Sequence, residues 1–284
     1  MASTTFPQLK FFATLWTFRE FPSAAQEWSL DQKFAEVKRK GFEAISGRIM
    51  PEVPALCAKH GLEYLLTIDA DGENYREQLE RAREMNPRRV NVQMCDHDTP
   101  PEEAARVWTA MVPIAEKLGL NIDLEVHRDT ATEVPEKAYA IADLYRKETG
   151  KTIRFCLDFS HFAVVKQLQP PYASRLLERP ELIAPVRQIH ARPFNNSHAQ
   201  IPATDGAGNL APEFIPWLQF TDEMLAMMLR TAGPEDVFYL CPEFGPKASG
   251  YALSCFPDPW LDEVRTRDEI RNLWKKRVSA PAAG

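Results

Sequence analysis

Eight short apolar runs alternate with amphipathic segments along the 284 residues, and this alternation limits the fold more than any other feature. Each run has the length and the β-branched or aromatic content of one buried strand, and the segments between runs have helical spacing. Alternation of this kind implies a parallel sheet with right-handed crossovers. Eight units favour closure into a single (β/α)8 TIM barrel, of class α/β, over an open doubly wound sheet. The predicted strands are 10–16, 42–46, 62–68, 89–94, 120–127, 152–159, 186–192 and 237–244.

The domain organisation follows from the absence of any break in composition. We expect one barrel domain over residues 1–284, with residues 279–284 as a disordered Ala/Pro-rich tail. Pro170 and Pro171 are predicted to divide the helical connection after the sixth strand into two pieces. No G-x-G-x-x-G follows the first strand, which argues against dinucleotide binding.

Charge and composition exclude several classes of protein. The 34 basic and 40 acidic residues give a net charge of −6 without long blocks of one sign, so we expect no nucleic-acid partner. The N-terminal residues show no leader pattern, and no apolar run reaches 18 residues, so we expect no membrane partner and a cytoplasmic location. Five cysteines without metal-type spacing are expected to be reduced, and Cys156 and Cys241 fall inside predicted strands.

Four consecutive predicted strands end in residues that can carry chemistry. In a TIM barrel all strands end at the same face, and that face holds the active site. Because side chains alternate along a strand, Glu125 and His127 point the same way, as do His190 and Arg192. We therefore expect Glu125, Asp158, His190 and Glu243 to converge. The alternative for each one alone is a helix cap or a core histidine with its hydrogen bonds satisfied.

Three carboxylates and one imidazole can hold one divalent ion and leave coordination positions open. Mostly oxygen ligands favour Mn²⁺ or Mg²⁺, and the imidazole also allows Co²⁺ or Zn²⁺. The predicted metal ligands are Glu125, Asp158, His190 and Glu243.

These motifs resemble a known family. The E-x-H, D-x-x-H and H-x-R motifs, with a last strand ending in Glu, are similar to those of the xylose isomerase-like TIM barrels, the sugar phosphate isomerase/epimerase superfamily. The resemblance covers nearly the whole chain in order, including the loop at Gly206–Gly208. It implies a metal held by the four residues just named, and it implies that His161 and Arg192 orient substrate oxygens. It also implies that Glu125 and Glu243 face each other across the reacting sugar carbon.

Endonuclease IV belongs to the same superfamily but uses three zinc ions and additional histidines. In this sequence the second and third strands end near Ser46 and Asp69, which offer no histidine, and residues 201–204 lack the Asp-x-His pair. These departures and the acidic net charge argue against DNA repair.

The expected activity is that of a metal-dependent sugar isomerase or epimerase acting on a keto sugar through an enediolate. A divalent ion bound to a carbonyl and the adjacent hydroxyl acidifies the neighbouring C–H, and Glu125 and Glu243 are the predicted catalytic acid–base pair. Loss of a β-substituent from the same enediolate would instead give a lyase or dehydratase, acting on a keto-inositol or a 3-keto-glycoside. A carbohydrate-binding barrel without turnover is the remaining alternative. The expected partner is a small-molecule sugar or keto-polyol.

Several other residues have two interpretations. Trp16, Phe18, Phe21 and Trp28 form either an apolar wall or lid beside the sugar, or ordinary packing. His127, Trp16 and Gln93 are further candidates for substrate binding, with Asp96 and His97 beside Gln93 at the end of the fourth strand. His60 and His198 are assigned to a helix end and a loop. Asp123 and Arg154 are predicted to form a buried structural ion pair. The helices that carry Trp108 and Trp274 pack on the core or in a contact between subunits, which leaves a homo-oligomer open.

Overall fold

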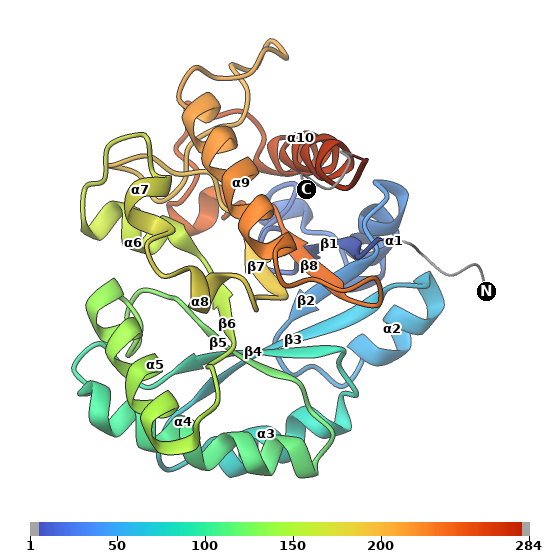
Figure 1. The fold of residues 1–284 in the computed structure, drawn as a ribbon. Coiled ribbons are helices and arrows are strands. Elements are labelled where there is room, and N and C mark those ends of the chain that lie inside the picture. Colours follow the sequence, from blue (N-terminus) through green and yellow to red (C-terminus); the bar gives the residue numbers. More distant parts are fainter. Residues whose placement is uncertain (1–5, 280–284) are drawn as a thin grey trace.

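The computed structural model describes residues 6–279, and its eight strands form a closed barrel in sequence order with every pair parallel (Figure 1). This confirms the predicted (β/α)8 fold. The last four strands are shorter than predicted: the fifth, sixth and seventh at both ends, and the eighth at its C-terminal end, where the chain leaves the sheet. The strands are β1 (Gln8–Thr14), β2 (Ala44–Gly47), β3 (Glu63–Ala70), β4 (Arg89–Met94), β5 (Ile122–Glu125), β6 (Phe155–Leu157), β7 (Gln188–His190) and β8 (Val237–Cys241).

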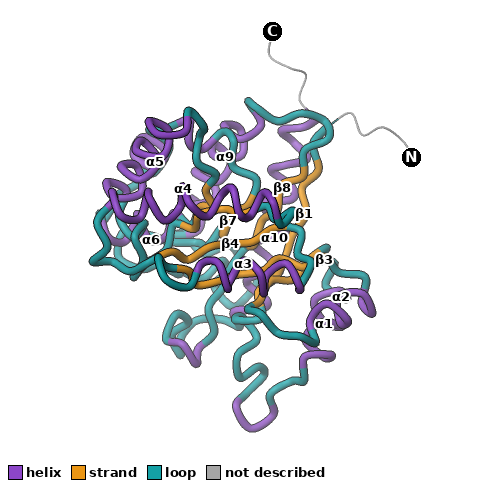
Figure 2. Tube along the Cα trace, turned by 90° about the horizontal axis from the view of Figure 1, so that it is seen from below, coloured by secondary structure: helices purple, strands orange, loops and turns teal. Residues whose placement is uncertain are grey.

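Helices surround the barrel, and Figure 2 shows α3 and α4 lying along the near side of the strands. After β6 the chain forms three short helices rather than the predicted two pieces. The additional break is at Pro180, whose missing N–H suits the first turn of a new helix. The helices are α1 (Leu30–Arg39), α2 (Val53–His60), α3 (Tyr75–Glu84), α4 (Pro101–Lys117), α5 (Pro135–Thr149), α6 (Phe159–Val165), α7 (Ala173–Leu176), α8 (Pro180–Ile183), α9 (Phe214–Leu229) and α10 (Pro259–Ser279), with 3-10 turns η1 (Ala24–Gln26) and η2 (Lys247–Ser249).

The strands bury both faces. Outward residues such as Phe11, Ile45 and Leu66 pack in one large core with the helices, and Trp108 and Trp274 are buried in it. Both tryptophans therefore belong to the core of the protein itself. A smaller cluster comes from the inward positions of β1, β2, β3 and β8, as alternation requires. It contains Phe12, Ala44, Leu65, Tyr239 and Cys241.

The N-terminal end of the barrel interior is closed by paired charges. The Arg89 guanidinium donates two hydrogen bonds to the Asp123 carboxylate, from Nε at 2.7 Å and from Nη2 at 2.6 Å. The predicted pair of Asp123 with Arg154 is therefore wrong, since Arg154 donates instead to the Ile122 carbonyl at 3.2 Å. Arg89 is the first residue of β4 and Arg154 directly precedes β6, so both lie beside Asp123 of β5, and alternation alone does not select between them.

Three further expectations concern the whole chain. Cys156 and Cys241 are buried within β6 and β8, and all five cysteines are free. Among residues 6–279, no helix combines the length and the apolar character needed to cross a membrane. The predicted tail begins at Ser279, which is the last residue of α10, while residues 280–284 lie outside the described residues.

Candidate active site and metal centre

Four buried side chains meet at the C-terminal end of the barrel, one from each of the last four strands. Glu125 is the last residue of β5 and His190 is the last residue of β7. Asp158 directly follows β6, and Glu243 lies two residues beyond β8. Asp158 also caps α6, because its Oδ1 accepts a hydrogen bond from the Ser160 amide at 3.0 Å. The cap uses one carboxylate oxygen and leaves Oδ2 available to the site.

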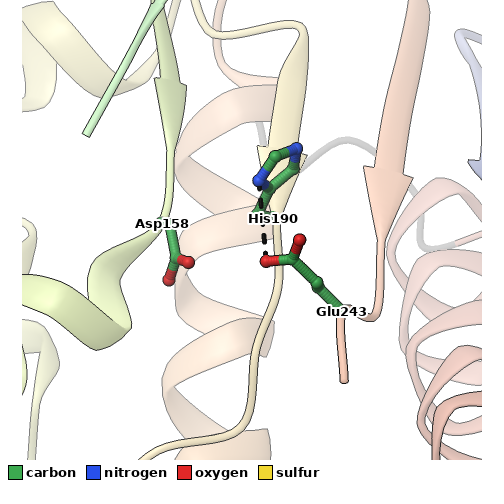
Figure 3. Close-up of side chains that lie close together, drawn as sticks. All are labelled: Asp158, His190 and Glu243. Carbon is green, nitrogen blue, oxygen red and sulfur yellow. Dashed lines mark ion pairs between the residues drawn. The ribbon is translucent and has the colours of Figure 1, made fainter. Parts of the chain in front are cut away.

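The ligand atoms of Asp158, His190 and Glu243 lie within 4.8 Å of one another (Figure 3). His190 Nδ1 lies 2.8 Å from Glu125 Oε1 and 3.7 Å from Glu243 Oε2. Those two carboxylate oxygens are therefore at most 6.5 Å apart, the sum of the two distances. The structure thus groups three of the four predicted ligands, Asp158, His190 and Glu243, closely enough to hold one ion, while Glu125 adjoins this group through His190.

Each glutamate of the cluster is held by a side-chain donor. The Asn91 amide donates to Glu125 Oε2 at 2.6 Å. Arg192 Nη2 donates to Glu243 Oε2 and also lies 3.1 Å from Asp158 Oδ2. Arg192 is therefore the cation that bridges two of the candidate metal ligands.

Burial and the charges of neighbouring side chains shift the pKa values of the cluster. Burial disfavours the charged imidazole of His190, but Cys156, Glu243 and Glu125 outweigh it and raise its pKa well above the ordinary value. Burial also works against the carboxylate of Glu125, yet the charge of His190 brings its pKa below the ordinary range. Arg192 and His161 likewise overcome burial and lower the pKa of Asp158. The lowered pKa values of Glu125 and Asp158 leave both of these carboxylates ionised at neutral pH.

The donor set fits a divalent metal ion. Asp158 Oδ2 and both ring nitrogens of His190 are buried and make no hydrogen bond of acceptable geometry, although other polar groups lie near them. Buried polar atoms of this kind are normally satisfied, so their presence indicates a missing partner. Carboxylate oxygens are the ligands that a hard divalent ion prefers, and three carboxylates stand beside the imidazole in this cluster. A divalent ion would supply the missing bonds.

A cavity of about 430 Å³ opens over this cluster, a size within the usual range for small-molecule sites. Glu125, His190 and Glu243 reach its wall, whereas Asp158 is buried behind them. The remaining predicted site residues that line the cavity are Trp16, Gln93, His127 and Arg192.

His161 does not line the cavity. Its Nε2 lies 3.4 Å from Asp158 Oδ2, and its ring packs edge-on against His127 with the centroids 4.7 Å apart. His127 Nδ1 lies 2.6 Å from the Arg128 carbonyl, which can only accept, so Nδ1 carries the proton. Burial lowers the pKa of His127, which leaves a neutral ring with Nε2 as an acceptor.

Tyr251 is part of the cavity wall, and sequence reasoning missed it. Its ring packs edge-on against Trp16 at 5.0 Å between centroids, and the Arg192 guanidinium lies 4.6 Å from the Tyr251 centroid and 5.4 Å from that of Trp16. A Cβ at Gly245 would lie 2.4 Å from Trp16 and 2.6 Å from Tyr251, so only glycine permits this packing. The only sequence feature that indicates this close packing is Gly245 itself, two residues after Glu243.

Three arginines of the cavity wall were also missed, namely Arg19, Arg48 and Arg128. They lie in the loops after β1, β2 and β5 and are exposed. Loop residues have no periodic pattern, so no sequence pattern indicates that these three loops share one cavity.

The other candidates lie elsewhere. Phe18 is fully buried and contacts Phe21, Trp28 and Trp260, so these aromatic residues are packing rather than a wall beside the cavity. Asp96 lines a neighbouring cavity. The three remaining histidines make surface contacts: His97 with Asp129, His60 with Asp31, and His198 with Asn195.

No protein-family model matches the sequence, and no curated protein matches it. Solved structures do match over nearly the whole chain. A xylose isomerase-like TIM barrel protein from Mycobacterium smegmatis, in complex with magnesium, has 15% identity and a TM-score of 0.60, covering 98% of this chain and 100% of its own. A D-allulose 3-epimerase from Methylomonas sp., in complex with D-allulose, has 15% identity and a TM-score of 0.56, covering 97% and 99%.

A third structure is that of a probable 3-DHS dehydratase from Bacillus anthracis, with 13% identity and a TM-score of 0.53, covering 96% of this chain and 100% of its own. These likenesses confirm the resemblance predicted from the strand-end motifs at the level of fold. The chain has the fold of the xylose isomerase-like TIM barrels, a fold that includes sugar epimerases and a dehydratase.

Proposed function

We propose that the protein is a divalent-metal-dependent isomerase or epimerase that acts on a keto sugar through an enediolate. The observation that carries this proposal is the pair of glutamates, Glu125 and Glu243, whose carboxylate oxygens lie 2.8 and 3.7 Å from His190 Nδ1 in the wall of one cavity. Sugar epimerases among the proteins of the same fold support it.

Glu125, Asp158, His190 and Glu243 are the residues proposed to hold the metal ion. When bound, a divalent ion supplies Lewis acidity, which lowers the pKa of the C–H beside a coordinated carbonyl and stabilises the enediolate oxygen. Mn²⁺ and Mg²⁺ suit the mostly oxygen donors best, and Co²⁺ and Zn²⁺ remain compatible with the imidazole.

The chain's own residues then supply the proton transfers. One of the two glutamates removes the proton from the carbon beside the carbonyl, and the other returns a proton. Asn91 fixes the orientation of Glu125, and Arg192 fixes that of Glu243, so each carboxylate is held for transfer at one side of the substrate. Return to the same carbon gives an epimer, and return to the adjacent carbon gives an aldose–ketose isomer.

The cavity wall is proposed to hold the sugar. Arg192 donates to substrate oxygens, His127 accepts through Nε2, Gln93 offers an amide, and Trp16 supplies an aromatic face for the sugar's C–H groups. The part assigned to His161 in substrate binding stays a prediction, because its contacts are with Asp158 and His127 behind the wall.

Elimination is the second candidate. The same enediolate loses a β-hydroxyl when a proton donor stands beside the leaving group, and the dehydratase with this fold supports the alternative. The neutral His127 presents the acceptor Nε2 and has no proton there to give to a leaving group, which favours isomerisation over elimination.

Solvent exchange distinguishes these reactions. The protein loaded with Mn²⁺ is incubated in D₂O with a panel of keto sugars and keto-inositols, and deuterium at the carbons beside the carbonyl is followed by NMR. Deuterium in recovered or isomerised sugar is expected, and EDTA treatment should abolish it. Enone formation would indicate a lyase. Exchange that persists without metal would contradict the proposal, as would no exchange with any sugar that binds.

A further inference from the structure

The mouth of the cavity carries positive charge from three separate loops. Arg19, Arg48 and Arg128 line it, in addition to the buried Arg192. The neighbouring cavity shares Gln93, His127 and Arg128 with it but is otherwise strongly acidic. Its acidic lining residues are Asp69, Asp71, Glu73, Asp96, Glu103 and Asp129.

The three arginines differ in how far their charge is neutralised. Arg48 is held by Asp69, with Nη1 and Oδ1 at 2.8 Å, and by the Gln93 side chain at 2.8 Å. The Arg128 guanidinium lies 5.2 Å from the Tyr251 ring centroid, on a ring that also contacts Arg192. Within residues 6–279, neither Arg19 nor Arg128 forms an ion pair with a carboxylate.

These cations are not needed to balance the buried carboxylates. Arg192 already contacts Asp158 and Glu243, and the donor cluster fits a divalent ion, whereas Arg19, Arg48 and Arg128 are exposed at the rim. Gathering cations at one mouth costs mutual repulsion, which a bound anion would remove. A net charge of −6 also repels anions in general, so a local positive region is what would attract one to this cavity.

We propose that the sugar bound at this site carries an anionic group, a carboxylate or a phosphate, at the end remote from the reacting carbons, and that Arg19 and Arg128 bind it. The guanidinium group matches both anions, because its parallel N–H donors form bidentate hydrogen bonds to their oxygens. Arg48, oriented by Asp69 and Gln93, borders the same region. This inference rests on the proposed function and narrows its substrate class.

Three probes that differ only at C6 test the proposal: D-fructose, D-fructose 6-phosphate and D-fructuronate. Their affinities for the Mn²⁺-loaded protein are measured by calorimetry. At least one anionic probe is expected to bind about tenfold more tightly than D-fructose. The advantage should shrink as salt concentration rises. Which anion gains more tells whether the group is a phosphate or a carboxylate.

The Arg19→Gln/Arg128→Gln double variant should remove the advantage of the anionic probe and leave the affinity for D-fructose unchanged. Arg83→Gln/Arg106→Gln, on α3 and α4 and away from the cavity wall, makes the same change in net charge and should behave like wild type. Equal affinity for all three probes, no binding of either anion at millimolar concentrations, or equal losses for neutral and anionic probes would overturn the subsite. Tight binding of an anion without deuterium exchange would leave the subsite standing and contradict the proposed reaction instead.

Discussion

At the N-terminal end of the barrel interior, Asp123 and Glu63 each have a partner of opposite charge, whereas the cluster at the C-terminal end contains buried polar atoms without a hydrogen bond. Arg89 and Asp123 form a two-bond pair, and Lys10 lies 2.8 Å from Glu63, whose other oxygen accepts from Tyr239. At the other end, Asp158 Oδ2 and both nitrogens of His190 make no hydrogen bond.

This difference distinguishes a stabilising region from the candidate functional site within a single barrel. Paired buried charges hold the interior in one arrangement. Buried polar atoms without a hydrogen bond destabilise the folded chain until a ligand bonds them. Active sites of TIM barrels lie at the C-terminal face, which is also the end where these buried polar atoms without hydrogen bonds lie. Substitution of a carboxylate at the C-terminal end should therefore lower turnover, and substitution of one at the N-terminal end should lower stability.

The largest expected effect is on turnover. Glu243→Gln keeps the size of the side chain and one oxygen donor but removes the base, so turnover should fall on the order of 10²–10⁴-fold. The assay is run at saturating Mn²⁺, so that weaker metal binding does not account for the loss.

Glu63→Gln, at the opposite end of the interior, is the matched control. It should weaken the contacts with Lys10 and Tyr239 and lower the melting temperature, while turnover stays near wild type. Near-normal turnover in Glu243→Gln would show that this residue is not part of the acid–base pair. Equal losses of turnover in both variants would contradict the separation of a catalytic end from a stabilising end.

The second effect is on stability. Asp123→Ala leaves the Arg89 guanidinium buried without its partner, and breaking a buried pair typically costs roughly 3–5 kcal/mol of unfolding free energy. Metal affinity should not change. Urea unfolding monitored by circular dichroism measures the loss.

Two further variants test whether the pair is the cause. Arg154→Ala removes only a hydrogen bond to the Ile122 carbonyl and should cost about 1 kcal/mol or less. Adding Arg89→Met to Asp123→Ala removes the unpaired charge and should recover much of the stability. A loss in Arg154→Ala as large as that in Asp123→Ala would mean that Arg89 is not the partner that matters.

The fold could be predicted because several independent sequence patterns indicate the same architecture. The apolar runs, the helical spacing between them and the strand-end acids all indicate the same barrel, and β4 begins and ends at the predicted residues. The position of the site followed from one rule, that parallel strands end at one face. Asp123 shows the limit of this reasoning, since alternation gave its direction but not which of two neighbouring arginines it contacts.

The residues at the rim of the cavity could not be predicted from the sequence, for a physical reason. Tyr251, Arg19 and Arg128 come from loops whose paths depend on long-range packing, such as the contact of Trp16 and Tyr251 across Gly245. The buried Gln200 amide also bonds both backbone groups of Gly245, at 2.5 and 3.1 Å, from a loop 45 residues away. Local patterns do not encode such pairings.

The smallest expected effect concerns Glu263, a further buried acid on the C-terminal side. Its Oε2 accepts a hydrogen bond from Thr17 Oγ1 at 2.9 Å, and its Oε1 has no partner. Thr17 also bonds Thr14, at 3.0 Å between the hydroxyl oxygens, and Thr14 lines the cavity. Burial raises the pKa of Glu263 well above its ordinary value of 4.5, and the charge of Glu243 adds to the rise.

The sign of the pH dependence follows from this raised pKa. Above pH 4.5 the unfolded chain releases the Glu263 proton while the folded chain keeps it, so stability falls as pH rises until the folded-state pKa is reached, by about 1.4 kcal/mol per pH unit. Glu263→Gln removes the titration and retains an acceptor for Thr17. Its unfolding free energy should match wild type near pH 4 and exceed it by at least about 1 kcal/mol at pH 8. A constant difference between the two proteins from pH 4 to pH 8 would mean that Glu263 is not held protonated.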